Sequence, residues 1–152
     1  MQNVSNIVKT LRLKPDGSGW TVSAGTSDVQ SDIVDTAGYD GVRFIIGFGA
    51  ITGGAVTSIK VQQNTANSLT GMADLLGSAI TVNDDDDNQI AISDIFRPLE
   101  RYLCLYTDRG SQNAVIDFVI AELYSPRVQP PTEDTSLVIS REMHASPAEG
   151  TA

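Results

Sequence analysis

The chain of 152 residues contains a single cysteine and a single histidine, and this scarcity removes several kinds of chemistry. Cys104 has no second thiol with which to form an intramolecular disulfide, and its place in an apolar run predicts a small buried hydrophobic residue. His144 lies near the C-terminus, where no local pattern holds it against Cys104 or a serine. One histidine and one cysteine also make a poor zinc site. We therefore expect no catalytic residue, no metal, no cofactor and a protein that is not an enzyme.

Positive charge and long apolar runs are also scarce. Ten Lys and Arg residues stand against nineteen Asp and Glu, which gives a formal net charge of -9. A chain of this charge is repelled by phosphate backbones, and it has no basic patch, so nucleic acid is not an expected partner. No stretch approaches the ~20 apolar residues of a membrane-spanning helix, and the N-terminus lacks the apolar segment of a signal peptide. We expect a soluble protein that does not bind membranes.

Alternating apolar residues predict β-strands through most of the chain. In the clearest strand, Gly41–Ala50, four apolar side chains fall on one face: Val42, Phe44, Ile46 and Phe48. Further strands are expected at Ile7–Leu13, Trp20–Ser23, Asp28–Val34, Ala55–Gln62, Ile80–Val82, Gln89–Phe96, Tyr102–Thr107 and Ala114–Tyr124. Only Leu69–Leu76 has a helical pattern. Many short strands with Gly- and Asp-rich turns favour an all-β fold, a jelly-roll-like antiparallel sandwich of about eight strands over residues 1–124.

Two features of these strands bear on how they pair. The residues Thr52–Gly54 form a turn signal, which predicts a hairpin between the strands on either side. In the strand Ala114–Tyr124, alternation places Ile116, Phe118 and Ile120 on one face and further apolar residues on the other. A strand that is apolar on both faces is expected to be central in a sandwich or covered by a partner chain.

The segment 125–152 differs from the rest. It holds four of the six prolines and one short apolar run, Leu137-Val138-Ile139. Such a composition cannot bury enough surface on itself to offset the entropy of ordering. We therefore predict an extended C-terminal arm that binds a partner, with Leu137, Val138 and Ile139 as the anchor and with Pro130 and Pro131 fixing an extended approach.

Three polar or glycine-rich features are candidate sites. The run Asp84–Asp87 could offer carboxylates to Ca²⁺, but consecutive side chains cannot all converge on one ion, and a solvated turn is favoured. The glycines around Phe48 lack the Lys and Ser/Thr of a phosphate-binding loop, and we expect them to permit close packing or a bulge. Arg97 and Arg101 flank a proline-broken connection, and in an acidic protein two guanidinium groups predict a docking point for carboxylates of a partner.

Aromatic residues, at 6% of the chain, are too few to favour a sugar-stacking platform. Trp20 and the four tyrosines could still form one, as lectin-like modules use. Tyr102 and Tyr106 fall at positions compatible with the core, which weakens this reading. A carbohydrate-binding module remains the alternative.

Three stretches carry a resemblance to a known group: VDTAGYDGVRFIIGFGAITGGAVTSIKVQQ, DIFRPLERYLCLYTDRGSQNAVIDFVIAELYSPR and the closing ASPAEGTA. They resemble the capsid decoration (cement) proteins of tailed bacteriophages, several of which are jelly-roll trimers at three-fold positions on the head. The resemblance covers the chain from about Val34 onward. It implies a structural protein made in the bacterial cytoplasm, which lies on the outer surface of the virion. There it would bridge major capsid protein subunits as a homotrimer. It carries over no contact residue.

Two other roles remain open from the sequence. One is a carbohydrate-binding or host-attachment module of the virion, and the other is a head-fibre or tail component. The first predicts aromatic side chains gathered on one rim. The second predicts few copies per particle, whereas a decoration protein is present in many.

Overall fold

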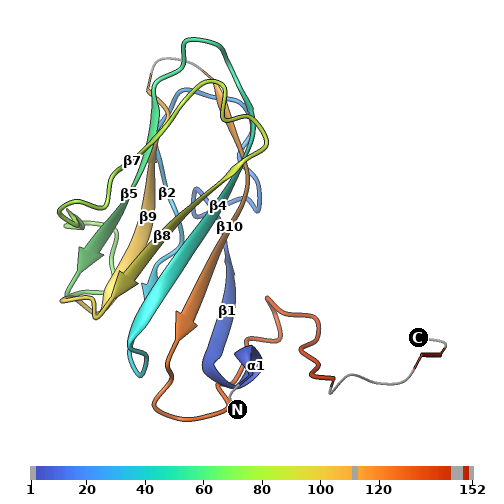
Figure 1. The fold of residues 1–152 in the computed structure, drawn as a ribbon. Helices are drawn as coiled ribbons and strands as arrows, with labels where there is room; N and C mark the ends of the chain where they lie inside the picture. Colours follow the sequence, from blue (N-terminus) through green and yellow to red (C-terminus); the bar gives the residue numbers. More distant parts are fainter. Residues whose placement is uncertain (1–2, 111–112, 145–148, 151–152) are drawn as a thin grey trace.

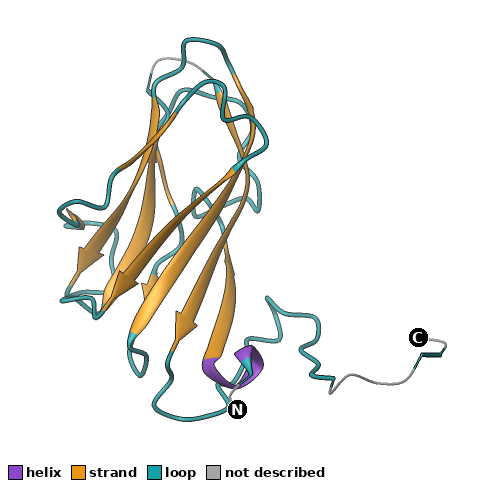
Figure 2. Ribbon diagram, viewed as in Figure 1, coloured by secondary structure: helices purple, strands orange, loops and turns teal. Residues whose placement is uncertain are grey.

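The computed structural model describes residues 3–110, 113–144 and 149–150, which form two antiparallel β-sheets packed face to face (Figures 1 and 2). A helix of four residues, α1 (Val4–Ile7), begins the described chain, and no described helix is long and apolar enough to cross a membrane. The first sheet contains, in spatial order, β1 (Val8–Leu13), β10 (Ala114–Tyr124), β4 (Gly41–Ile51) and β8 (Ile90–Phe96). The second contains β2 (Val29–Gln30), β9 (Tyr102–Asp108), β5 (Thr57–Asn64) and β6 (Ala73–Asp74), with β3 (Val34–Asp35) also beside β9 and β7 (Ile80–Val82) also beside β5.

The order of the strands is that of a jelly roll. The chain crosses between the sheets at successive long strands, so that β4 is followed by β5 in the other sheet, β8 by β9, and β9 by β10. The first and last strands are therefore neighbours, with Val8 opposite Tyr124. This confirms the prediction of a jelly-roll-like antiparallel sandwich. The hairpin expected at Thr52–Gly54 is wrong, because β4 and β5 lie in opposite sheets and bury their apolar faces in one shared core.

The core lies between the facing sheets. The four residues predicted on one face of β4, Val42, Phe44, Ile46 and Phe48, are 0–3% exposed. They belong to one buried cluster with residues of the second sheet, Ile59, Val61, Leu103 and Leu105. Burying one such side chain contributes about 1.5–3 kcal/mol, so this face of β4 is a principal source of stability.

Strand β10 departs from simple alternation because its register shifts twice. The irregularities lie between Ala114 and Ile116 and between Ile116 and Phe118. A bulge sets two residues opposite one and reverses the faces that follow it. Ile116 is therefore buried, whereas Phe118 and Ile120 are half-buried on the outer face. The expectation that these three residues share a face is wrong.

Several short segments also differ from the predictions. Leu69–Leu76 is not helical and contains the two-residue strand β6, flanked by Gly71 and Gly77 at φ values of 86° and 78°. A right-handed helix excludes such angles. Trp20–Ser23 contributes a single bridge to β10, and Asp28–Val34 is divided between β2 and β3.

Candidate functional site

The C-terminal arm leaves the sandwich after β10 and is first held by two backbone hydrogen bonds. The N–H of Ser125 donates to the carbonyl of Ile7 at 3.0 Å, and the N–H of Arg127 donates to the carbonyl of Gly38 at 2.8 Å. Beyond this root the described part of the arm passes beside β1 (Figure 1). Near its end Met143 contacts Asn3 at the other end of the chain. Residues 125–144 contain no strand, and the predicted arm stays a prediction over its full length, because residues 145–148 and 151–152 lie outside the described part.

An ion pair of the arm lies against the open edge of β1. Arg141 is 2.9 Å from the carboxylate of Glu133, and it also donates to the carbonyls of Val8 at 2.9 Å and Pro131 at 2.7 Å. Glu133 in turn accepts from the backbone N–H of Thr10 at 3.3 Å. The side chain of Glu133 is 11% exposed and that of Arg141 is 24% exposed. Because β1 pairs with β10 on one side only, this ion pair covers backbone groups at a free sheet edge.

The predicted anchor divides into a covered part and an exposed part. The N–H groups of Leu137 and Val138 both donate to the carbonyl of Asp134 at 2.9 Å, which makes a turn. Leu137 is half-buried and lines a groove of about 430 Å³ between β1 and β3. Ile139 is 106% exposed. The role of the anchor in binding a partner stays a prediction, and Ile139 is the member most available for it.

The two prolines expected to direct the arm have different surroundings. Pro130 is exposed and follows a cis peptide bond after Gln129. Pro131 is buried, and its carbonyl is one of the acceptors of Arg141. Pro131 therefore belongs to the contact between arm and body. The role of Pro130 and Pro131 in binding a partner stays a prediction.

Arg97 and Arg101 lie at the same end of the sandwich, in a groove of about 510 Å³ that Arg127 also lines. Arg101 donates two hydrogen bonds of 2.7 Å to Asp35, which lower the pKa of that carboxyl. The positive charge of Arg101 is therefore paired with a carboxylate of the same chain. Arg97 lies over the ring of Phe96 at 5.0 Å, and the described part of the chain places no carboxylate within ion-pair distance of it. The predicted docking role is untested, and Arg97 is the better placed of the two.

The outer face of the first sheet is apolar along β8. Ile90, Ile92 and Phe96 are 57%, 46% and 62% exposed. Beside them, on the neighbouring strands β4 and β10 of the same sheet, lie three half-buried apolar residues, Ile45, Phe118 and Ile120. Gly47 lets the Phe118 ring lie directly on β4, since a Cβ there would overlap that ring. The expectation that glycines near Phe48 permit close packing is confirmed.

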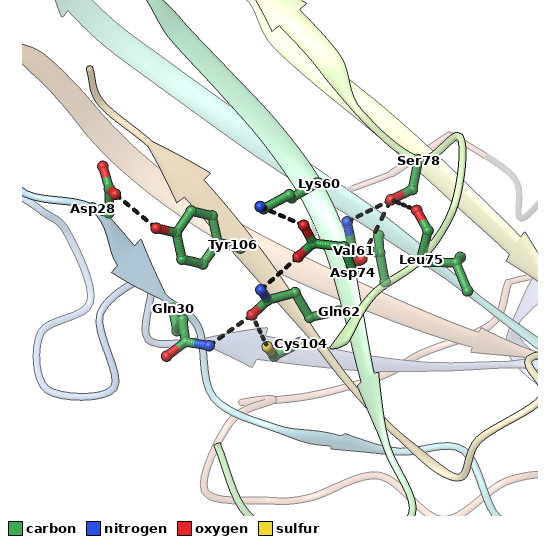
Figure 3. A network of polar contacts seen from close by, with 10 residues as sticks. All are labelled: Asp28, Gln30, Lys60, Val61, Gln62, Asp74, Leu75, Ser78, Cys104 and Tyr106. Carbon is green, nitrogen blue, oxygen red and sulfur yellow. Dashed lines mark hydrogen bonds and ion pairs between the residues drawn. The ribbon is translucent and has the colours of Figure 1, made fainter. Parts of the chain in front are cut away.

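The outer face of the second sheet is polar and internally paired (Figure 3). Asp74 accepts from Lys60 and from Gln62, both at 2.7 Å, and Gln62 accepts from Gln30 at 2.7 Å. Beneath this network Cys104 is fully buried, and burial raises the pKa of its thiol to about 12. The prediction of a buried Cys104 is confirmed, and the thiol is unreactive at neutral pH.

The acidic run has a structural part in the neighbouring turn. The carboxylates of Asp84 and Asp87 accept from the backbone N–H groups of Gly54 and Ile51, and that of Asp86 closes its own turn. The carboxylates thus point to separate donors, as a turn requires. Over the described residues, no group of three or more His, Cys, Asp or Glu side chains is arranged to hold a metal ion.

The aromatic residues considered for a sugar-stacking platform are Trp20 and the tyrosines. Trp20 is 40% exposed, with Arg12 and Lys14 at 5.2 and 5.6 Å from its ring centre. Tyr102 and Tyr106 are half-buried on the outer face of the second sheet, so the expectation of core positions is wrong: the intervening residues of β9 fill the core instead. Two of the five aromatic side chains thus share one outer face, and the carbohydrate alternative stays a prediction.

His144 lies in the exposed arm, 3.1 Å from Glu142.

The functional residues that sequence reasoning missed are Arg109, Glu133 and Arg141. Arg109 stands in a turn signal, yet it is only 5% exposed, and its guanidinium donates to the carbonyls of Ser23, Ser27 and Ala114. Long-range partners of this kind leave no local signal in a sequence.

Comparison with known proteins gives one similar solved structure and no related family or curated protein. No protein-family model matches the chain, and no curated protein matches it. Among solved structures, the CBM22-1 xylan-binding domain of Xyn10C from Paenibacillus barcinonensis is similar, with a TM-score of 0.43 and 12% identity. The match covers 82% of this chain and 99% of that one. The class that the strand order defines is a jelly-roll β-sandwich with a C-terminal arm.

Proposed function

We propose that this protein is a structural virion component that decorates the outer surface of a tailed-phage capsid and stabilises it by bridging major capsid protein subunits. The resemblance in sequence supports this function. The structural observation that carries it is the arm, which Glu133 and Arg141 fasten to β1 but which exposes Ile139 and Met143 at 106% and 61%. Apolar side chains on an exposed arm favour burial against a second molecule.

The arrangement of the arm root supports a bridging role. Arg127, in the first turn of the arm, lines the same groove as Arg97. A capsid surface that carries carboxylates can therefore meet the groove and the arm together. The trimer implied by the resemblance would engage three arms at once and gain avidity. The net charge of -9 suits the outer surface of the capsid better than a DNA-lined interior.

Co-sedimentation of the purified protein with capsids assembled from the major capsid protein tests the proposal. Deletion of residues 125–152 should weaken binding or trimer stability, and Ile139→Asp should weaken binding at least about tenfold, since a charge replaces an exposed apolar contact. Val56→Asp is the matched control, because Val56 is also exposed, at 68%, but lies on the connection between β4 and β5.

Two results would reject the proposal. One is unchanged capsid occupancy and thermal tolerance of heads after deletion of the arm. The other is a low copy number in purified particles, which would indicate a tail or fibre component instead. Binding of the isolated protein to glycans would favour the carbohydrate alternative.

A further inference from the structure

Strand β8 leaves one edge of the first sheet unpaired. The N–H of Arg97 donates to Asp40 and the N–H of Phe48 donates to Gln89, so the odd-numbered residues of β8 direct their backbone groups toward β4. In an antiparallel strand the intervening residues direct theirs to the opposite side. The backbone groups of Ile90, Ile92, Asp94 and Phe96 therefore point outward, and no other strand of the described chain pairs with β8.

This edge lacks the protection found on β1. The edge of β1 is covered by Glu133 and Arg141, and at its end Lys14 exchanges hydrogen bonds with Asp32. Natural edge strands are guarded by such cover, or by charged side chains, proline or bulges. Over its seven residues β8 has no proline or bulge and one charged side chain, Asp94, and grooves of about 220 and 270 Å³ lie between it and residues 75–82. The residues whose backbone groups point outward include three exposed apolar side chains. An edge of this kind is suited to pairing with another strand.

The charges at the two ends of β8 are opposite. The acidic run Asp84–Asp87 lies just before the strand, and Arg97 lies just after it. An antiparallel copy of the same strand would set the acidic end of each against the basic end of the other. A pair of β8 strands would therefore bring Arg97 of each copy near the acidic run of the other, which gives two favourable charge contacts.

We propose that β8 pairs antiparallel with β8 of a second copy of this chain, about a two-fold axis at Ser93. In this register Ile90 faces Phe96 of the second copy, which is a favourable β-branched and aromatic pair, and Ile92 faces Asp94. A register centred on Asp94 would set two carboxylates against each other. The pairing joins the two first sheets into one continuous sheet.

This contact is independent of capsid binding and of the three-fold contacts implied by the resemblance. It requires only the purified chain, so its failure and the failure of the proposed function are measured separately.

Cysteine cross-linking tests the register. The double variant Ile90→Cys/Phe96→Cys should form a disulfide-linked dimer on mild oxidation, because facing residues lie roughly 5.5 Å apart between Cα atoms, within disulfide range. Each single variant should form little, since each introduced thiol then lies far from its own copy. The native Cys104 does not interfere, because it is fully buried. No cross-linking in the double variant, or equal cross-linking in the singles, overturns the proposal.

Sedimentation of the unmodified chain provides a second test. Ile92→Pro removes an N–H that β4 does not use, so it should raise the dimer dissociation constant at least about tenfold while leaving the fold intact. Arg97→Glu should weaken the dimer as well, whereas Arg12→Glu, the same charge change on β1, should not. A chain that is monomeric at all concentrations, or a self-association that none of these changes affects, overturns the proposal.

Discussion

Arg141 joins the carboxylate of Glu133 to the backbone carbonyl of Val8, so a side chain of the arm completes the edge of the first strand. The arm is therefore tied to the folded sandwich as far as Arg141, and Met143 still contacts Asn3 near the N-terminus. The Ile139 side chain, fully exposed between Glu133 and Arg141, is accessible to a partner without unfolding the body.

Arg141→Ala should release the arm from β1. The substitution leaves the largely buried Glu133 carboxylate without its ion partner, and we expect it to favour the open arm by about 1–3 kcal/mol. Hydrogen exchange at the Thr10 amide and limited proteolysis of residues 125–144 measure the opening. Glu142→Ala is the control, because Glu142 is exposed and its carboxylate contacts only neighbours within the described arm, Ser140 and His144. Equal protease sensitivity in both variants would contradict the role of Arg141 in holding the arm to β1.

Arg109→Ala should destabilise the whole sandwich. Its guanidinium is buried and holds the carbonyls of Ser23, Ser27 and Ala114, which would lose their donors together. We expect a loss of about 2–3 kcal/mol in the free energy of unfolding, measured by urea denaturation. Arg109→Lys should recover only part, since one ammonium group cannot reproduce the planar fork. A wild-type midpoint for Arg109→Ala would refute this role.

Gly110→Ala should also be costly. Gly110 has a φ of 52°, and an added Cβ would overlap the carbonyl oxygen of Val56. Backbone strain and the overlap together are expected to cost about 2 kcal/mol or more. Gly53→Ala serves as the control, because nothing lies within 4 Å of a Cβ at that position. Thermal unfolding of the two variants should therefore differ by several degrees.

The bond between Tyr106 and Asp28 predicts a loss of stability at high pH. The phenol donates to the carboxylate at 2.6 Å, which raises the pKa of Tyr106 to about 12 and lowers the pKa of Asp28. The contribution of Tyr106 is fully present below its unfolded pKa of about 10 and is lost as pH rises through about 12. That of Asp28 is present above its ordinary pKa and is lost as pH falls through the lowered value.

Denaturation at a series of pH values measures this dependence. Tyr106→Phe should flatten the decline between about pH 10 and 12, because the variant has no phenol to ionise at that position. Tyr102→Phe, on the same face of β9 with its ring against Arg101, provides the control. If both variants follow the wild type through this range, the hydrogen bond does not contribute to stability.

The fold was predictable to the extent that it depends on alternation. Val42, Phe44 and Ile46 were placed correctly because each side chain meets the same core. Alternation does not say which sheet a strand joins, so the expected β4–β5 hairpin failed. It also fails at a bulge, which reversed Ile116 relative to Phe118. Pairing is decided by contacts between residues far apart in the sequence.

The candidate site was predictable only in outline. Composition identified the arm, because prolines and sparse apolar residues are visible locally. Composition could not identify the contact that holds the arm to β1, because Glu133 and Arg141 bind Thr10 and Val8 at the other end of the chain. The outward direction of β8 was equally hidden, since it depends on the register with β4 rather than on the residues of β8 alone.

The position of β10 between β1 and β4 has a consequence for biosynthesis. Of the strands in that sheet, the ribosome delivers β10 last, yet it fills the slot between two strands made earlier. Until β10 emerges, the nascent chain holds β1 without its sheet neighbour, and the first sheet cannot close. Pairing between such distant segments slows folding and leaves apolar edges open to aggregation in the interval.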